Sequence, residues 1–128
     1  MASPPAHRAP AWRASPWHPF VYAQVVQSPE TYGVVILADK DRDPLLVSHG
    51  MIREEMWKLH HSPRCAASGA VFFRYVETLL EDEAERLARI IRAQLTRISG
   101  HPIGWGDFYP PPAVELVGAT LTKRPVPP

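Results

Sequence analysis

The chain has 128 residues, enough for one compact domain and too few for two. Hydrophobic residues make up 45% and charged residues 21% of the sequence, which excludes a fibrous or wholly disordered chain. With 14 basic and 13 acidic residues, the formal net charge of +1 gives no overall field that would draw the protein to nucleic acid or anionic lipid. Any such binding requires a local patch.

Cys65 is the single cysteine of the chain. One thiol excludes an intramolecular disulfide and a zinc site built from cysteines, and it fits a reducing compartment. No stretch approaches the roughly 18 apolar residues of a membrane span, and prolines interrupt any targeting helix near the amino terminus. We therefore expect a cytoplasmic protein that does not insert into membranes.

The 15 prolines gather toward the two ends of the sequence. This shift in composition predicts a proline-rich tail at residues 1–20, a folded domain at 21–100, and an aromatic and proline-rich extension at 101–128. Within the extension, residues 113–123 alternate well enough for one more strand, interrupted by Gly118. Such a strand would pair with a sheet edge of the same molecule or of a neighbour.

The first half of the domain alternates between apolar runs and turn residues. Runs rich in Val, Ile, Leu, Tyr and Phe predict three neighbouring strands, with a turn at 39–44. From residue 51 to 61 the apolar spacing becomes helical, and Pro63 ends this helix. The predicted strands are residues 20–26, 32–38 and 45–47.

The second half contains one more strand and a long helix. Small residues at 65–69 predict a loop, and the β-branched and aromatic residues at 70–76 predict a central strand. Thr78 and the acidic residues after it are typical of a helix start, and apolar residues then recur at helical spacing until Gly100. We therefore predict a small α+β fold in which a mostly antiparallel sheet packs with two main helices.

Two segments carry a family pattern. The first is Tyr32-Gly-Val-Val-Ile-Leu-Ala-Asp-Lys-Asp-Arg-Asp-Pro-Leu-Leu-Val47, followed by the helix Ile52-Arg-Glu-Glu-Met56. The second is Phe73-Arg-Tyr-Val-Glu-Thr-Leu79, followed by Glu83-Ala-Glu-Arg-Leu87. Together they resemble the GIY-YIG nuclease domain over residues 32–95, and the resemblance implies that fold. An unrelated α+β domain with the same order of elements is the alternative.

The residues at that family's functional positions argue against its reaction. Val35 aligns with the water-activating tyrosine and Ala88 with the metal-binding glutamate, and neither side chain can do that chemistry. Glu55 stands where the resemblance places a phosphate-binding arginine. The tyrosine and glycine of the second motif fall near Leu46 and Ser48. The resemblance therefore implies a catalytically silent relative, with no catalytic residues, no metal and no cofactor.

Other site chemistries have weak support in the sequence. His60, His61 and Cys65 match no standard zinc spacing, and adjacent helical residues point about 100° apart. The loop around Cys65 has no signature of a cysteine nucleophile. An enzyme site around His49, His60 and Glu55 stays open as an alternative for which no motif argues.

The predicted long helix carries arginines on its polar face. With Arg53 they form a candidate phosphate-binding set, so a nucleic-acid-binding protein or divergent metal-dependent nuclease is the alternative function. Neighbouring acidic residues dilute this charge, and a solvated helix face explains the pattern equally well. The candidates are Arg53, Arg86, Arg89 and Arg92.

Large aromatic residues suggest binding to protein. Trp57 falls outside the apolar stripe of its helix, so we expect its ring to be partly exposed. Aromatic anchors in proline-rich segments lose little entropy on docking, either on their own domain or on another protein. We therefore expect a non-enzymatic interaction or assembly subunit that binds a protein partner or itself. The other anchor candidates are Trp12, Trp17, Trp105, Phe108 and Tyr109.

Overall fold

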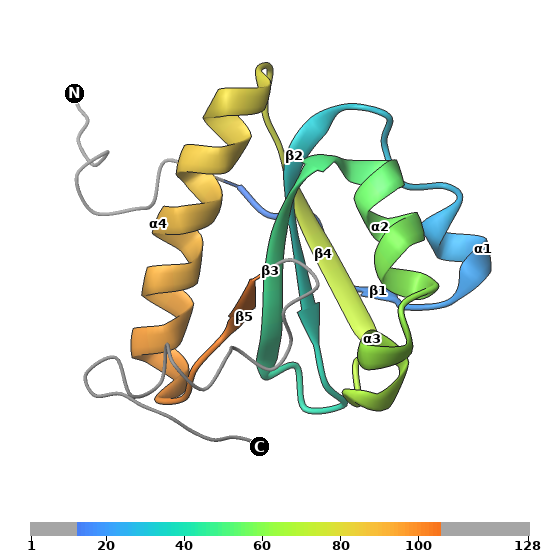
Figure 1. The fold of residues 1–128 in the computed structure, drawn as a ribbon, viewed down its shortest axis with the longest axis vertical. Helices are drawn as coiled ribbons and strands as arrows, with labels where there is room; N and C mark the ends of the chain where they lie inside the picture. Colours follow the sequence, from blue (N-terminus) through green and yellow to red (C-terminus); the bar gives the residue numbers. More distant parts are fainter. Residues whose placement is uncertain (1–12, 106–128) are drawn as a thin grey trace.

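The structure, a computed structural model, describes residues 13–105. In this range five strands and four helices form an α+β fold, which confirms the predicted class (Figure 1). Among these residues no helix is both long enough and apolar enough to span a bilayer. The elements are β1 (His18–Pro19), α1 (Tyr22–Val25), β2 (Tyr32–Ala38), β3 (Pro44–Met51), α2 (Ile52–His60), α3 (Pro63–Ala67), β4 (Phe72–Glu77), α4 (Glu81–Ser99) and β5 (Gly104–Trp105).

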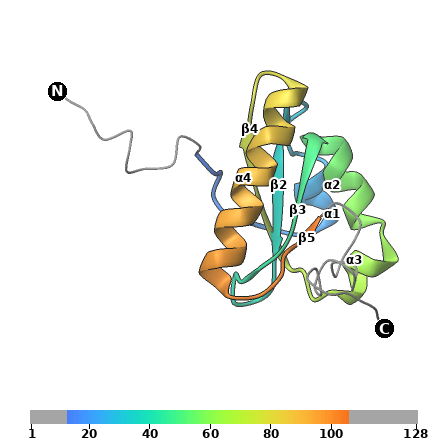
Figure 2. The same ribbon diagram turned by 60° about the vertical axis from the view of Figure 1, so that its left-hand side comes forward.

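The sheet has the strand order β1-β4-β2-β3-β5 and is mixed. Strand β2 lies at its centre and pairs antiparallel with both β3 and β4, while β5 runs parallel to β3 (Figure 2). The sequence predicts a mostly antiparallel sheet, and the structure has three antiparallel pairs and one parallel pair, β3 with β5. The parallel pair arises because Gly100 ends α4 in the left-handed conformation, after which the chain turns back and reaches the edge of β3.

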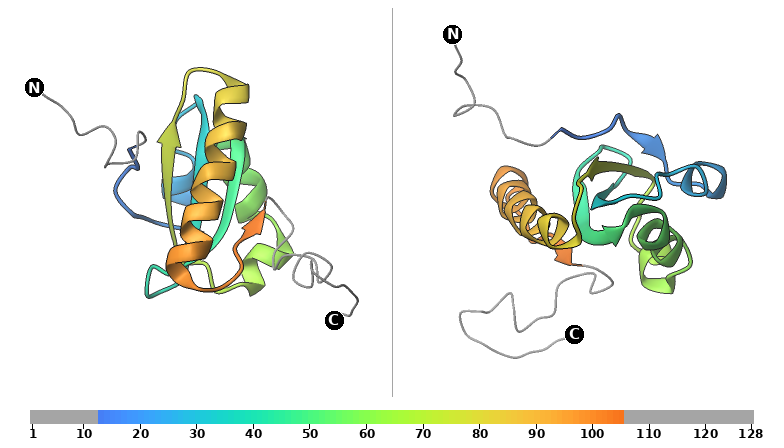
Figure 3. Two further views of the ribbon diagram at one scale, coloured as in Figure 1. Left: turned by 90° about the vertical axis from the view of Figure 1, so that its left-hand side faces the viewer. Right: turned by 90° about the horizontal axis from the view of Figure 1, so that it is seen from above.

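Helices α2 and α4 cover opposite faces of the sheet, giving three layers (Figure 3). Residues 33–38 of β2 are all buried, because alternate side chains enter two separate cores. Val35 and Leu37 pack with α2, whereas Val34 and Ile36 pack with α4. The centre of the sheet is therefore apolar on both sides.

The predicted strand at 20–26 is wrong. The structure has the short helix α1 there, with Val25 as its buried residue. A strand needs an open edge, and the outer edge of β4 is occupied by β1 and by Ser15, whose N–H donates to the carbonyl of Tyr75 at 2.7 Å. The predicted loop at 65–69 likewise contains most of α3, which Ser62 caps.

Residues 13–20 belong to the folded unit, although their prolines resemble a tail. The N–H of Tyr75 donates to Ser15 Oγ at 3.0 Å, and Arg74 Nε donates to the Ser15 carbonyl at 3.0 Å. The Arg74 guanidinium also lies 4.5 Å from the centre of the Trp17 ring. These contacts fasten the segment along β4.

Candidate functional site

Aromatic and imidazole rings gather where α1 meets α2, and we call this the aromatic surface. The rings of Tyr22 and Trp57 lie 5.8 Å apart, and the rings of Trp57 and His61 lie 4.1 Å apart. Trp57 is 46% exposed and Tyr22 55% exposed. The aromatic surface consists of Val21, Tyr22, Trp57, His60 and His61.

The helical repeat of α2 explains why Trp57 faces outward. Ile52, Met56 and Leu59 form the buried stripe against the sheet, and Trp57 follows Met56 at about 100° around the helix axis. The His61 ring is held over Trp57 because its Nδ1 donates to the Trp57 carbonyl at 2.8 Å, which also satisfies a carbonyl at the helix end. This hydrogen bond holds the His61 ring beside the exposed Trp57 ring.

Ion pairs flank the aromatic surface on both sides of α2. Arg53 Nη1 lies 2.7 Å from a carboxylate oxygen of Glu30, and Lys58 Nζ lies 2.7 Å from one of Glu55. Glu55 also accepts a hydrogen bond of 2.7 Å from the buried Ser48 hydroxyl, which connects α2 to β3. Arg53 and Glu55 therefore both bind other residues of their own chain.

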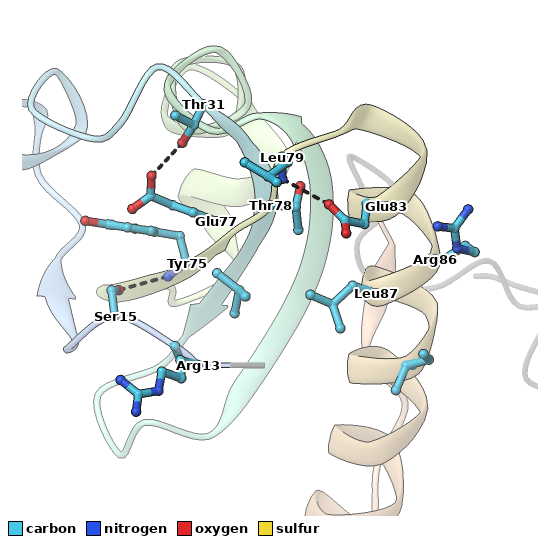
Figure 4. A pocket seen from close by; sticks show the side chains of 13 residues that line it. Arg13, Ser15, Thr31, Tyr75, Glu77, Thr78, Leu79, Glu83, Arg86 and Leu87 are labelled. Atoms are coloured by element: carbon cyan, nitrogen blue, oxygen red, sulfur yellow. Dashed lines mark hydrogen bonds between the residues drawn. The ribbon is translucent and has the colours of Figure 1, made fainter. Parts of the chain in front are cut away.

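A groove of about 880 Å³ lies between β4, the first turns of α4 and residues 13–15 (Figure 4). Several of its polar groups are bonded to one another: the Thr31 hydroxyl donates to Glu77 at 2.9 Å, the Ser15 N–H donates to the Tyr75 carbonyl, and the Tyr75 N–H donates to Ser15 Oγ. Glu83 accepts hydrogen bonds from backbone N–H groups at the start of α4. The apolar lining includes Val76, Leu87 and Ile90.

The predicted phosphate-binding arginines do not form one patch. Arg53 is on α2, whereas Arg86, Arg89 and Arg92 are on α4, across the sheet. Arg86 pairs with Asp82 at 3.3 Å, and Arg92 Nε donates to the Ile103 carbonyl at 2.9 Å. Arg89 pairs with Glu85 at 2.8 Å, and its hydrogen bond and charge hold the pKa of that carboxyl below its usual value.

Two other predicted anchors, Trp17 and Trp105, are half-buried against their own chain. Trp17 packs beside α4 and under Arg74. Trp105 packs between His49, at 5.5 Å between ring centres, and the guanidinium of Arg92, 5.5 Å from its ring centre. The remaining anchor candidates lie outside the described residues; they are Trp12, Phe108 and Tyr109.

Tyr22 and Val21 complete the aromatic surface but are missing from the sequence-based candidates. The composition of residues 20–26 predicts a strand, so the sequence alone places Val21 and Tyr22 in the sheet and not beside α2. The outward position of Trp57 on α2 was the one signal pointing to this region. Tyr22 could be placed beside it only after α1 was known to pack on α2.

The positions aligned with catalytic residues lie in the core. Val35, Leu46 and Ala88 are at most 1% exposed. His49 contacts Trp105 near α4, while Glu55 bonds Ser48 on the α2 side, so the alternative enzyme site is not assembled. Burial raises the pKa of the Cys65 thiol to about 11, so little thiolate exists at neutral pH. Among residues 13–105, no three His, Cys, Asp or Glu side chains are grouped as a metal site would require.

Comparison with known families gives one match. Residues 13–94 match the family described as Domain of unknown function (DUF7508). No curated protein and no solved structure matches the chain. The assignment to the GIY-YIG nuclease family is therefore wrong, because the family found is a different one. Its alignment depended on the order of strands and helices and on core positions such as Val35, which packing alone explains.

Proposed function

The chain belongs to the DUF7508 family, and we propose that it is a non-enzymatic protein-interaction module that binds its partner through the aromatic surface. The observation that carries this proposal is the exposure of Trp57 and Tyr22 side by side, on α2 and α1. Tryptophan and tyrosine, with arginine, are the residues enriched among interface hot spots. Burying about 100 Å² of each ring would contribute about 2.5 kcal/mol per ring.

The charges favour a protein partner over nucleic acid. The candidate arginines are divided between two faces of the sheet, and Arg53, Arg86 and Arg89 each have a carboxylate partner. Phosphate binding would have to break these pairs or compete with them. An apolar aromatic contact keeps its strength as salt screens exposed charges. Partner binding that persists in high salt is therefore the expected behaviour.

Site-specific photo-crosslinking tests this proposal. An amino acid with a benzophenone side chain is introduced in place of Val21, at the border of the aromatic surface. The full chain that carries it is expressed in cells of the organism from which the protein comes. We expect adducts of defined mass that persist in high salt, and we expect Trp57→Ala to weaken the underlying binding by about 30-fold. Truncating this ring removes the contact without touching the buried stripe of α2.

Ile98 provides the matched control, because it is an exposed apolar residue on α4, away from the aromatic surface. The same crosslinker at position 98 is expected to give no such adducts. Equal adducts at both positions, or adducts that Trp57→Ala leaves unchanged, would refute the proposal. Adducts with nucleic acid that vanish in high salt would instead favour the arginine faces.

A further inference from the structure

We propose that Arg42 and Arg74, which we call the arginine pair, form a binding site for the phosphate group of a small phosphorylated molecule. This proposal goes beyond the proposed function, because the pair lies on the opposite side of the sheet from the aromatic surface. Neither residue is among the arginines that the sequence suggested. The proposal follows from the position of the two guanidinium groups, from their hydrogen bonds, and from the charges around them.

Alternation along β4 places the arginine pair on the α4 side of the sheet. Phe73 packs in the core beneath α2, whereas Val76 packs in the core beneath α4. Phe72 and Arg74 alternate with Phe73 along the strand, so their side chains face the same side as Val76. Arg42 comes from the turn between β2 and β3, and its guanidinium lies 5.1 Å from the centre of the Phe72 ring. Two distant segments of the chain thus bring their positive charges to one face.

Each guanidinium of the arginine pair lies over an aromatic ring. The Arg74 guanidinium lies 4.5 Å from the centre of the Trp17 ring, and its Nε donates to the Ser15 carbonyl at 3.0 Å. Arg42 has a φ of 63°, in the left-handed region that residues other than glycine seldom adopt, and in this conformation its guanidinium reaches Phe72. These contacts restrict both side chains, so a ligand that binds them removes less conformational freedom.

No carboxylate among residues 13–105 neutralises the arginine pair. No Asp or Glu oxygen of these residues lies within 4.0 Å of either guanidinium. The two Nη groups of Arg74 and the whole guanidinium of Arg42 donate no hydrogen bond to the described part of the chain. Burial lowers the pKa of Arg74, and the nearby charge of Arg42 lowers it further. An anion between the two groups would relieve this repulsion.

The charge and the donors of the arginine pair fit a phosphate monoester. At neutral pH this group carries between one and a half and two negative charges, roughly equal and opposite to the two guanidinium charges, and it offers three acceptor oxygens. A planar guanidinium binds such oxygens through two parallel hydrogen bonds. A carboxylate or a phosphodiester of a nucleic-acid backbone carries a single negative charge and would balance only half of the pair.

The aspartates of the turn oppose a bound anion to different degrees. Asp39 accepts the backbone N–H groups of Asp41 and Asp43 at 2.8 and 3.0 Å, and Asp43 lies 2.9 Å from Nε2 of His101. The carboxylate of the exposed Asp41 makes no such contact with the described residues. We therefore expect Asp41→Asn to strengthen phosphate binding about 2-fold, because it removes a carboxylate one residue from Arg42.

Titrations of the full chain with inorganic phosphate and with phenyl phosphate test this proposal. The Nε–H signals of the arginines are followed by NMR at constant ionic strength, so that general screening does not change during the titration. We expect the signals of Arg42 and Arg74 to shift together, with a dissociation constant of about 1–10 mM for inorganic phosphate.

Two charge-removing variants show whether the phosphate binds at the arginine pair. Arg42→Gln keeps a polar side chain at an exposed position of the turn, and we expect it to weaken phosphate binding at least about 10-fold. Arg86→Gln is the matched control, because it makes the same change in net charge at an exposed arginine that is paired with Asp82. This control should leave the affinity unchanged. Far-ultraviolet circular dichroism verifies that each variant is folded.

Three outcomes overturn the proposal. They are an absence of shifts at the arginine pair, binding that Arg42→Gln leaves unchanged, and equal binding of an oligonucleotide with and without a 5′-phosphate. The last result would assign the pair to a nucleic-acid backbone. Because the crosslinks at Val21 and the titration with phosphate use different residues, a failure of one experiment leaves the other conclusion standing.

Discussion

Gly33 occupies a position in β2 where no side chain fits. A Cβ placed there would overlap the backbone carbonyl of Val76 on β4 and lie 2.6 Å from Cδ1 of Ile52. Both neighbours are buried, and a backbone carbonyl cannot move as a flexible side chain would. We expect Gly33→Ala to lower the free energy of unfolding by at least about 3 kcal/mol, measured by urea denaturation.

Gly69→Ala separates this steric effect from backbone strain. Gly69 has a positive φ of +90°, but a Cβ there would meet open space. The control should therefore cost only the strain, about 1 kcal/mol. If Gly33→Ala were no more destabilising than Gly69→Ala, the close contact with Val76 would not limit this position.

The chemistry of a side chain can be read from the sequence, whereas its contacts depend on the fold. Val35 and Ala88 cannot carry acid–base or metal chemistry wherever they lie. Glu55 accepts a hydrogen bond from Ser48, which precedes it by seven residues in the chain. Its side chain also lies close to Gly50, where a Cβ would be 3.1 Å from Glu55 Cγ. Such a contact depends on the path of the chain and is invisible to local periodicity.

At the level of elements, His101 joins the end of α4 to the turn between β2 and β3. Its Nδ1 lies 3.0 Å from the Pro102 carbonyl and its Nε2 lies 2.9 Å from Asp43. The Pro102 carbonyl first, and then the hydrogen bond and charge of Asp43, raise the pKa of His101 above its usual value, against the lowering effect of burial. Both ring nitrogens can donate only when the imidazole is charged.

The raised pKa fixes the direction of the pH effect on stability. A group that binds its proton more tightly in the folded state stabilises fully below its unfolded pKa, near 6.5, and this contribution is lost as the pH rises through the folded pKa. His101→Ala should therefore destabilise more at pH 5.5 than at pH 8.5. Urea unfolding of both proteins at these two pH values measures the difference.

Asp43→Asn tests how much of the pH dependence of stability comes from Asp43 and how much comes from the Pro102 carbonyl. This variant removes the charge of Asp43 but keeps the Pro102 carbonyl, so part of the pH dependence should remain. A His101→Ala protein whose loss of stability is the same at both pH values would show that this imidazole is not linked to folding.

Elements were predictable where the signal is local. The run at 32–38 and the apolar stripe of Ile52, Met56 and Leu59 each carry their own periodicity, and the structure has β2 and α2 there. Residues 20–26 have a composition suited to a strand, but whether a sheet edge is open to them depends on Ser15 and β1. Ser15 and β1 occupy the edge of β4, which lies about 50 residues further along the chain. The local composition of residues 20–26 could not reveal that this edge is already occupied.

For the whole molecule, residues 13–19 close one edge of the sheet. Ser15 and β1 cover β4, and Trp17 packs beside α4. Deleting residues 1–19 would expose this edge and remove several hydrogen bonds, so we expect a loss of about 3–5 kcal/mol and aggregation. Thermal unfolding with simultaneous light scattering measures both effects.

Deleting residues 1–12 is the matched control, because it keeps every contact of residues 13–19 described above. It should unfold close to the temperature of the full chain. Equal behaviour of the two deletions would show that the edge contacts of Ser15 and β1 do not support the fold.

The candidate site was only half accessible from the sequence. The outward position of Trp57 follows from helical spacing alone, and the structure has it 46% exposed. Tyr22 joins it only because α1 packs on α2, a tertiary contact between residues 35 positions apart in the chain. Tertiary structure also separates Arg53 from the arginines of α4, which the sequence alone grouped together.

Gly33 also determines how β2 aligns with its neighbours. Because β2 is apolar on both faces, a slip of one residue would exchange one set of apolar side chains for another, and burial alone would barely distinguish the two alignments. Any such slip brings Tyr32 or Val34 against the Val76 carbonyl, where no side chain fits. The single glycine of β2 thus disfavours both one-residue slips and favours the observed register of the sheet.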